Sequence, residues 1–162
     1  METFVFFSFL DTTHVKTCRP GAGPVDATDG DRREGAWNIQ RAFCSTYLKC
    51  NGLKCQTVML PNGMWGSIYI ASVRHNDLGM VNLSALPDLL LQHFVNHNIT
   101  IGNGGYPSMY GDAIYNNTLV ITRKIENAVE GTFEWYLNKR LNSARQCIEH
   151  GYLDLFGELF SC

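Results

Sequence analysis

Residues 6–16 read Phe-Phe-Ser-Phe-Leu-Asp-Thr-Thr-His-Val-Lys, an apolar run that leads straight into the carboxylate of Asp11. Residues 3–10 are rich in aromatic side chains and short, which favours a buried β-strand. We expect this strand to stop at Asp11. A strand end is a rigid place for a metal-ligating carboxylate, and it is equally an ordinary place for a turn cap.

The size and composition of the chain indicate one domain with a well-filled core. The 162 residues are 45% hydrophobic and 17% charged, and that charged fraction is below the roughly 25% usual for soluble domains. A low charge content favours a buried sheet over a solvated helical rod. The net charge of −2 argues against a protein that coats nucleic acid, although it leaves room for a site that holds cations.

The cysteines and the apolar segments indicate an intracellular protein that does not cross a membrane. The six cysteines form no Cys-x-x-Cys pair and no zinc-ligand spacing, so we interpret them as reduced thiols. The first ten residues lack the features of a signal peptide. No apolar run approaches the roughly 18 residues of a membrane-spanning helix.

A β-hairpin is the strongest local prediction. The β-prone runs 53–60 and 65–73 flank Pro61-Asn62-Gly63, and an Asn-Gly pair between two such runs is a hairpin signal. Residues 19–36, by contrast, are rich in Gly, Pro and Asp and predict a loop or an insertion.

The remaining segments predict two helices and two short strands. Residues 84–97 favour a helix with Ser84 as N-cap, and 108–113 and 119–122 favour short strands. Residues 132–156 favour a long helix whose apolar side chains share one face: Phe133, Leu137, Leu141, Ala144, Ile148 and Tyr152. This order predicts a single α/β domain with a mixed sheet flanked by helices.

Four carboxylates stand at the ends of predicted elements or on the last helix: Asp11, Asp77, Asp112 and Glu149. Oxygen ligands on rigid elements suit a hard cation such as Mg²⁺, and two such ions can drive phosphodiester cleavage. Structural roles explain the same residues. Asp11 and Asp77 would then be caps, Asp112 would stabilise a turn, and Glu149 would pair with Arg145 one helical turn away.

Five short segments of the sequence resemble, in the same order, motifs in the nuclease domain of PIF/Harbinger-type DDE transposases, the DDE superfamily endonucleases. They are DTTHVKTCRP at 11–20, LKCQTVMLPNG at 53–63, SVRHNDL at 72–78, YGDAIY at 110–115 and SARQCIEHGY at 143–152. The resemblance extends from about residue 8 to residue 156, which is nearly the whole chain.

The resemblance implies an RNase H-like fold and a metal-dependent DNA endonuclease that uses Mg²⁺ or Mn²⁺. By position, Asp11 matches the first catalytic aspartate, Asp112 the aspartate of the Gly-Asp word, and Glu149 the helix glutamate. Asp77 matches a further acidic residue and is expected to ligate metal as well. Whether Asp77 or Asp112 is the essential middle carboxylate stays open. DNA is the implied partner, and the nucleus is the implied location.

The chain departs from the family pattern at Thr12, at Ala113-Ile114 and at His150. It also begins close to the first catalytic strand, so we expect the upstream DNA-binding region of the family to be absent and a separate DNA-binding protein to replace it. These departures favour an alternative function, a catalytically inactive, transposase-derived binding or interaction module.

Overall fold

The computed structural model describes residues 6–17, 42–102 and 104–159, of which 153–159 are described as backbone alone. The expected loop over residues 19–36 lies outside the described residues. The fold is mixed α/β, as the sequence predicts. Its elements are β1 (Phe6–Lys16), β2 (Cys44–Ser45), β3 (Cys50–Met59), β4 (Trp65–Ser72), α2 (Asp77–Ser84), α3 (Leu86–Asn96), β5 (Ser108–Gly111), β6 (Ile121–Arg123) and α4 (Phe133–Leu159).

The sheet is built around β1. On one side β1 pairs antiparallel with β3, which pairs antiparallel with β4 and, at its first residues, with β2. On the other side β1 pairs parallel with β5, and β5 pairs parallel with β6. The sheet is therefore an antiparallel meander extended on its far side by two parallel strands.

Strand β1 is longer than the sequence predicts, and our expectation that it stops at Asp11 is wrong. The strand continues to Lys16 because β3 pairs with it along its whole second half, from Asp11↔Thr57 to Lys16↔Gly52. Asp11 consequently lies in the middle of a paired strand. Long-range pairing here outweighs the polar, turn-like character of residues 12–14.

The predicted hairpin is confirmed as β3 and β4. Its turn is made by Leu60 to Gly63, in which the Gly63 N–H donates to the Leu60 carbonyl at 2.9 Å. Gly63 has a φ of 82°, a left-handed conformation that glycine adopts without strain. Proline at the second position and glycine at the fourth are the residues that this turn favours.

The predicted helix over 84–97 is wrong at its start. Two helices, α2 and α3, occupy this region, and they meet at Ala85, whose φ is 49°. Asn76 caps α2 by accepting a hydrogen bond from Gly79 N at 2.7 Å. Ser84 ends α2 rather than starting α3, and its hydroxyl donates to the Val81 carbonyl at 3.0 Å.

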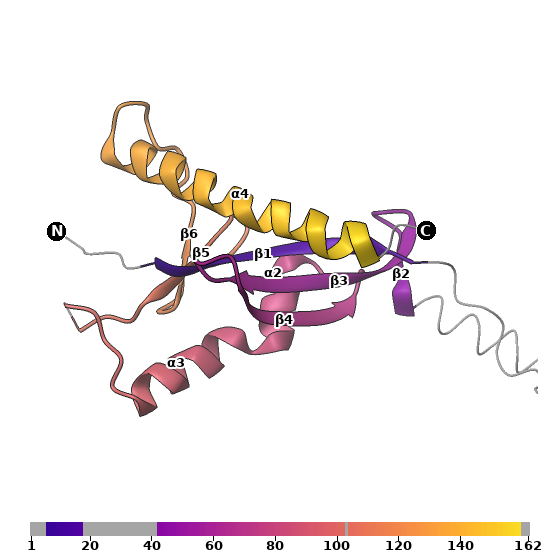
Figure 1. Cartoon of the computed structure of the whole chain (residues 1–162), viewed down its shortest axis with the longest axis horizontal. Helices are drawn as coiled ribbons and strands as arrows, with labels where there is room; N and C mark the ends of the chain where they lie inside the picture. Colours follow the sequence, from indigo (N-terminus) through magenta and orange to yellow (C-terminus); the bar gives the residue numbers. More distant parts are fainter. Residues whose placement is uncertain (1–5, 18–41, 103, 160–162) are drawn as a thin grey trace, which may run out of the picture.

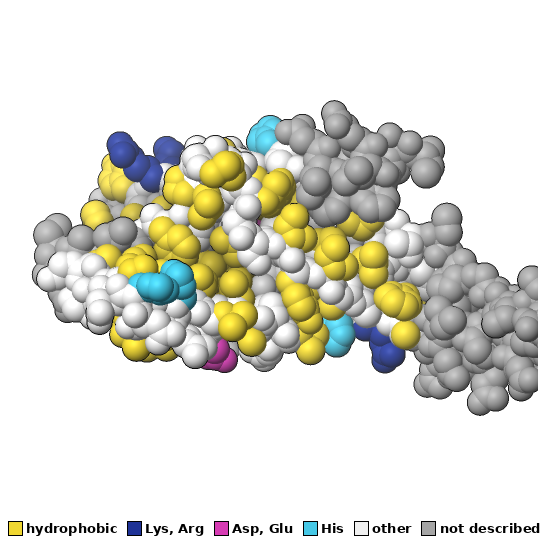
Figure 2. Space-filling view, turned by 60° about the horizontal axis from the view of Figure 1, so that its bottom comes forward, with side chains coloured by type: hydrophobic (Ala, Val, Ile, Leu, Met, Phe, Trp, Pro, Cys, Tyr) yellow, Lys and Arg dark blue, Asp and Glu magenta, His cyan; other side chains and the backbone are white. Residues whose placement is uncertain are grey.

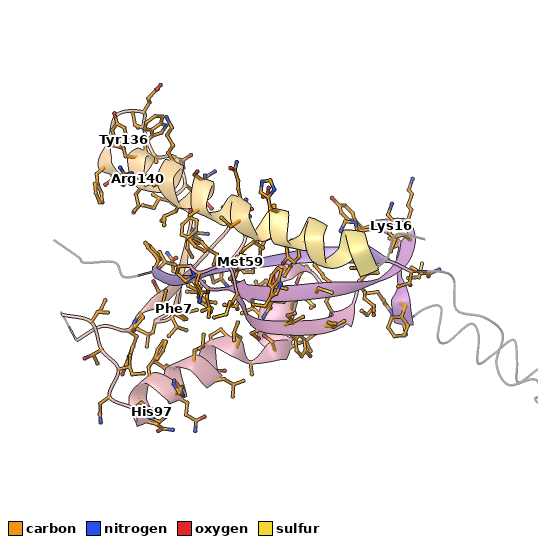
Figure 3. The ribbon with its side chains drawn as sticks, in the orientation of Figure 1. Phe7, Lys16, Met59, His97, Tyr136 and Arg140 are labelled. Atoms are coloured by element: carbon orange, nitrogen blue, oxygen red, sulfur yellow. The ribbon has the colours of Figure 1, made fainter. Side chains whose placement is uncertain are left out.

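Helices cover both faces of the sheet (Figure 1). One cluster, which includes Leu10, Val58 and Phe94, fills the space under α2 and α3. A second cluster joins Met59, Ile148 and Tyr152 between the sheet and α4. Figure 3 shows this division, with Phe7 on the side of α3 and Met59 on the side of α4. Successive residues of β1 therefore point to opposite layers, Leu10 to α2 and Asp11 to α4.

The face that carries α3 and β4 is largely uncharged. Figure 2 shows hydrophobic side chains spread over it, with few charged groups among them, and the exposed apolar side chains of α3 include Leu89 and Val95. Across the described ranges, no helix has an apolar stretch long enough to cross a bilayer. The acidic residues on which a metal site would depend gather elsewhere, under α4.

Candidate functional site

Asp11 and Asp112 lie on neighbouring strands at the same level of the sheet. The parallel register of β1 and β5 pairs Ser8 with Met109 and Phe9 with Tyr110. Two residues further along each strand come Asp11 and Asp112, the latter directly after the end of β5. Because the side-chain period of a strand is two residues, Asp11 shares the face of Phe9, which α4 covers. Asp112 lies near it, since its charge contributes to the raised pKa of Asp11.

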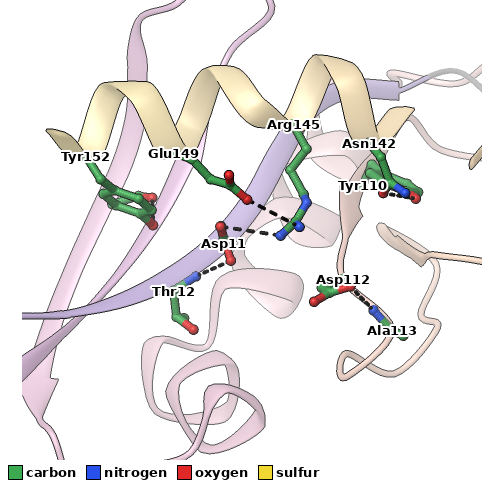
Figure 4. A network of polar contacts seen from close by, with 10 residues as sticks. Asp11, Thr12, Tyr110, Asp112, Ala113, Asn142, Arg145, Glu149 and Tyr152 are labelled. Carbon is green, nitrogen blue, oxygen red and sulfur yellow. Dashed lines mark hydrogen bonds and ion pairs between the residues drawn. The ribbon is translucent and has the colours of Figure 1, made fainter. Parts of the chain in front are cut away.

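The long helix α4 supplies the third carboxylate, Glu149, together with Arg145. The guanidinium of Arg145 contacts Glu149 Oε1 through Nη2 at 3.5 Å and Asp11 Oδ2 through Nη1 at 3.5 Å. Figure 4 shows the guanidinium beside these two carboxylates, which lie on one side of it, with Asp112 on the other side. The structure therefore brings Asp11, Asp112 and Glu149 to one place, although 101 and 37 residues separate them along the chain.

Asp11 sits in an environment that disfavours its charge. The pKa of its carboxyl group is raised to about 6, mainly by burial and to a lesser extent by the carboxylates of Glu149 and Asp112. The Thr12 N–H, which donates to Asp11 Oδ1 at 2.9 Å, and the Arg145 guanidinium both lower this pKa. A buried, ionised Asp11 thus depends on a nearby positive charge.

A tight loop fixes Asp112. The Ala113 N–H donates to Asp112 Oδ1 at 2.8 Å, and the Tyr115 N–H donates to the Asp112 carbonyl at 3.1 Å. The ring of Tyr115 then folds back onto Gly111, where an added Cβ would come within 2.6 Å of Tyr115 Cδ2. The Gly-Asp-x-x-Tyr word is explained by this packing, because only glycine leaves room for the ring.

Asp77 belongs to the other layer. It opens α2 and forms an ion pair with Lys54, whose side chain is 15% exposed. Lys54 shares the face of Gln56, which donates to Ser84 of α2 at 2.9 Å. The structure therefore separates Asp77 from the other three acids by the sheet. Burial raises the pKa of the Tyr115 hydroxyl, and the charges of Asp11, Asp77 and Asp112 raise it as well, so this hydroxyl is near both sets of acids.

Two polar contacts fix α4 over the site. The hydroxyls of Tyr152 and Thr57 hydrogen-bond in the buried interface with β3. The hydroxyl of Tyr110 donates to Asn142 Oδ1 at 3.3 Å, and burial raises its pKa to about 12. Because these contacts lie on either side of Arg145 along the helix, they hold Arg145 and Glu149 over Asp11.

A cavity of about 520 Å³ opens between β6 and α4. Apolar side chains, among them Leu137 and Leu141, line part of it, and Arg123 and Lys124 line its polar part. Arg123 Nη1 also donates to the carbonyl of Ala113, next to Asp112, at 3.4 Å. The cavity is therefore connected with the loop that holds Asp112.

The donor chemistry of the site fits a divalent cation. Asp11, Asp112 and Glu149 offer the oxygen ligands that Mg²⁺ and Mn²⁺ prefer. Within the described part of the chain, however, no three His, Cys, Asp or Glu side chains are grouped closely enough to hold one ion together. The guanidinium of Arg145 lies where two of the carboxylates converge, so the arrangement shown is an ion-pair network.

The structural roles considered from sequence are realised in part. Glu149 pairs with Arg145, Asp77 lies in the first turn of a helix, and Asp112 stabilises a turn. The contact of Arg145 with Asp11 has no sequence signal, because 134 residues separate the two. The Thr57–Tyr152 contact could not be predicted from the sequence either, because these two residues are also far apart along the chain.

Comparison of the chain with family models, with curated proteins and with solved structures gives no match.

Proposed function

We propose that this chain is a nuclease domain that hydrolyses DNA phosphodiester bonds with Mg²⁺ or Mn²⁺ bound by Asp11, Asp112 and Glu149. The observation that carries the proposal is the convergence of these three carboxylates on one face of the sheet (Figure 4). The resemblance of the sequence words to DDE transposases agrees with it. DNA as substrate, a separate DNA-binding partner and a nuclear location belong to the same proposal.

The sheet supports an RNase H-like fold as part of this proposal. Three antiparallel strands (β1, β3 and β4) are followed by β5 and β6, which add parallel to β1 on its other side. This is the arrangement expected of an RNase H-like sheet. One acid in the first strand, one after β5 and one on the last helix agree with it as well.

The residues of the chain have distinct tasks in this function. A bound divalent cation supplies a water molecule of lowered pKa and neutralises charge on the phosphate. Asp11 and Asp112 are held by backbone N–H groups, so they present fixed ligands. Arg123 and Lys124, which line the neighbouring cavity, are the cationic residues assigned to contact with DNA phosphates in this proposal.

A cleavage assay with matched variants tests this function. Purified protein is incubated with labelled duplex DNA and Mg²⁺ or Mn²⁺, and Asp11→Asn, Asp112→Asn and Glu149→Gln are compared with wild type. Each of these variants is expected to lose cleavage by about a hundredfold or more. Asp77→Asn, the same change in the other layer, is expected to stay within about twofold. Equal cleavage by wild type and Asp11→Asn would refute the proposal.

A second function, a catalytically inactive binding module, is favoured by one observation. Arg145 already supplies a positive charge to Asp11 and Glu149, so the acids form a closed network without metal. If this function holds, Mn²⁺ leaves the melting temperature of wild type unchanged even at millimolar concentration. Saturable metal binding by wild type excludes it.

A further inference from the structure

Arg145 contacts Asp11 and Glu149, two of the carboxylates to which the proposed function assigns a metal ion. We propose that Arg145 is the resting counter-ion of Asp11 and Glu149, and that a divalent cation binds by displacing its guanidinium. The inference rests on the proposed function. It adds that Arg145 competes with the metal ion for Asp11 and Glu149. The affinity for the metal ion then depends on how much more strongly Asp11 and Glu149 interact with the metal ion than with the guanidinium of Arg145.

The site needs a positive charge when no metal is present. Asp11 and Arg145 have side chains that are 17% and 19% exposed, so water screens their charges only partly. Without a counter-ion, Asp11 would face the like charges of Asp112 and Glu149 in a poorly hydrated place. Arginine is charged at every physiological pH, so it supplies the compensation permanently.

The contacts of Arg145 are loose enough to be exchanged. Both of its ion-pair distances are 3.5 Å, whereas strong charge-assisted hydrogen bonds are about 2.7–2.9 Å long. Its Nε is buried and has no hydrogen-bond partner among the described residues. Glu149 is 56% exposed, so its half of the network costs little to open.

The chemistry of the two cations also favours displacement of the Arg145 guanidinium by a metal ion. A hard divalent cation prefers carboxylate oxygens and carries twice the charge of a guanidinium. The two cations would repel each other if both stayed at Asp11 and Glu149. The long, flexible side chain of Arg145 allows the guanidinium to leave while its stem stays packed on α4.

The test is a calorimetric titration with Mn²⁺ alone, which requires no cleavage. Arg145→Gln is expected to bind Mn²⁺ about tenfold more tightly than wild type, because a competing charge has been removed. Arg140→Gln removes the same charge from an exposed position of α4 (Figure 3) and is the matched control, expected to bind within about twofold of wild type. Arg145→Lys keeps the charge and is expected to bind like wild type or slightly more tightly. Asp11→Asn combined with Arg145→Gln is expected to abolish binding.

The outcomes separate this inference from the proposed function. If Arg145→Gln binds Mn²⁺ as wild type does, or more weakly, the displacement is refuted and the metal site stands. If neither protein binds Mn²⁺, the proposed function fails and this inference fails with it. If only Arg145→Gln binds, Arg145 blocks the site in wild type, so the displacement is refuted and wild type is the inactive module. Should Arg145→Gln fold poorly, a metal affinity of Arg145→Lys several-fold below that of wild type would refute the displacement.

Discussion

The hydroxyl of Tyr152 hydrogen-bonds the hydroxyl of Thr57, the residue of β3 that stands directly opposite Asp11 in the sheet. One contact thus ties the last helix to the strand position next to the first acid. Glu149 lies less than one helical turn before Tyr152. The position of the third carboxylate is therefore coupled to the packing of α4 on β3.

Removing this contact is expected to destabilise the protein without creating a large cavity. Tyr152→Phe leaves the Thr57 hydroxyl buried and without that partner, which costs about 1–2 kcal/mol of unfolding free energy. Urea denaturation measures the loss. Tyr136→Phe, an exposed tyrosine of the same helix, is the control and should change stability by less than about 0.5 kcal/mol. Equal effects of the two changes would contradict a special role for Tyr152.

Glycine is required at position 111. The added Cβ of Gly111→Ala would come within 2.6 Å of the Tyr115 ring, so the loop that fixes Asp112 must shift. We expect a loss of about 2 kcal/mol in unfolding free energy, as for an overpacked core. Gly102→Ala is the control, because its Cβ would meet nothing within 4 Å. Thermal melts of both variants check the prediction, and a neutral Gly111→Ala would disprove it.

The charge of Asp11 makes stability depend on pH. Its folded-state pKa of about 6 lies above the ordinary value of 3.8 for an aspartate, mainly because the carboxyl group is buried. The folded state therefore binds more protons than the unfolded state between these values, and unfolding free energy falls as pH rises from about 4 to 6. Asp11→Asn removes this loss and should be more stable than wild type at pH 7, by about 3 kcal/mol, and similar at pH 4.

Urea titrations of both proteins at several pH values measure the effect. A variant that is less stable than wild type at pH 7 would contradict it, since the ion pair with Arg145 would then outweigh the cost of burial. A gain in stability on losing a charged side chain is typical of residues kept for function.

The ion pair of Asp77 with Lys54 is expected to be structural. Asp77→Asn leaves Lys54, which is 15% exposed, without its partner and should cost about 1 kcal/mol. Lys54→Met combined with Asp77→Asn should cost less than the sum of the single changes. A double-mutant cycle by urea denaturation measures this coupling. Additive effects would show that the pair contributes nothing to stability.

Local signals in the sequence predict the elements that depend on neighbouring residues. Pro61-Asn62-Gly63 predicts the hairpin turn, and the apolar stripe from Phe133 to Tyr152 predicts α4. Both elements depend on contacts between residues that are close in the chain, so the spacing of residue types in the sequence predicts them.

Features that depend on distant residues could not be predicted in this way. The second half of β1 is polar, and only its pairing with β3 makes it a strand. The break between α2 and α3 requires a positive φ at Ala85, where no glycine marks it. The contact of Arg145 with Asp11 likewise depends on how α4 packs on the sheet. Asp11, Asp112 and Glu149 could be chosen as candidates from the sequence because each lies in one of the motifs that resemble DDE transposases, and the motifs occur in the family's order.

The order of the three acids along the chain has a consequence for biosynthesis. During translation the ribosome makes Asp11 in the central strand first and α4 with Glu149 last. A nascent chain can pair β1 with β3 long before that helix emerges, but it lacks Arg145 and Glu149. The carboxylate cluster is therefore assembled only when α4 docks, so any activity that depends on the cluster is withheld until that helix has been made.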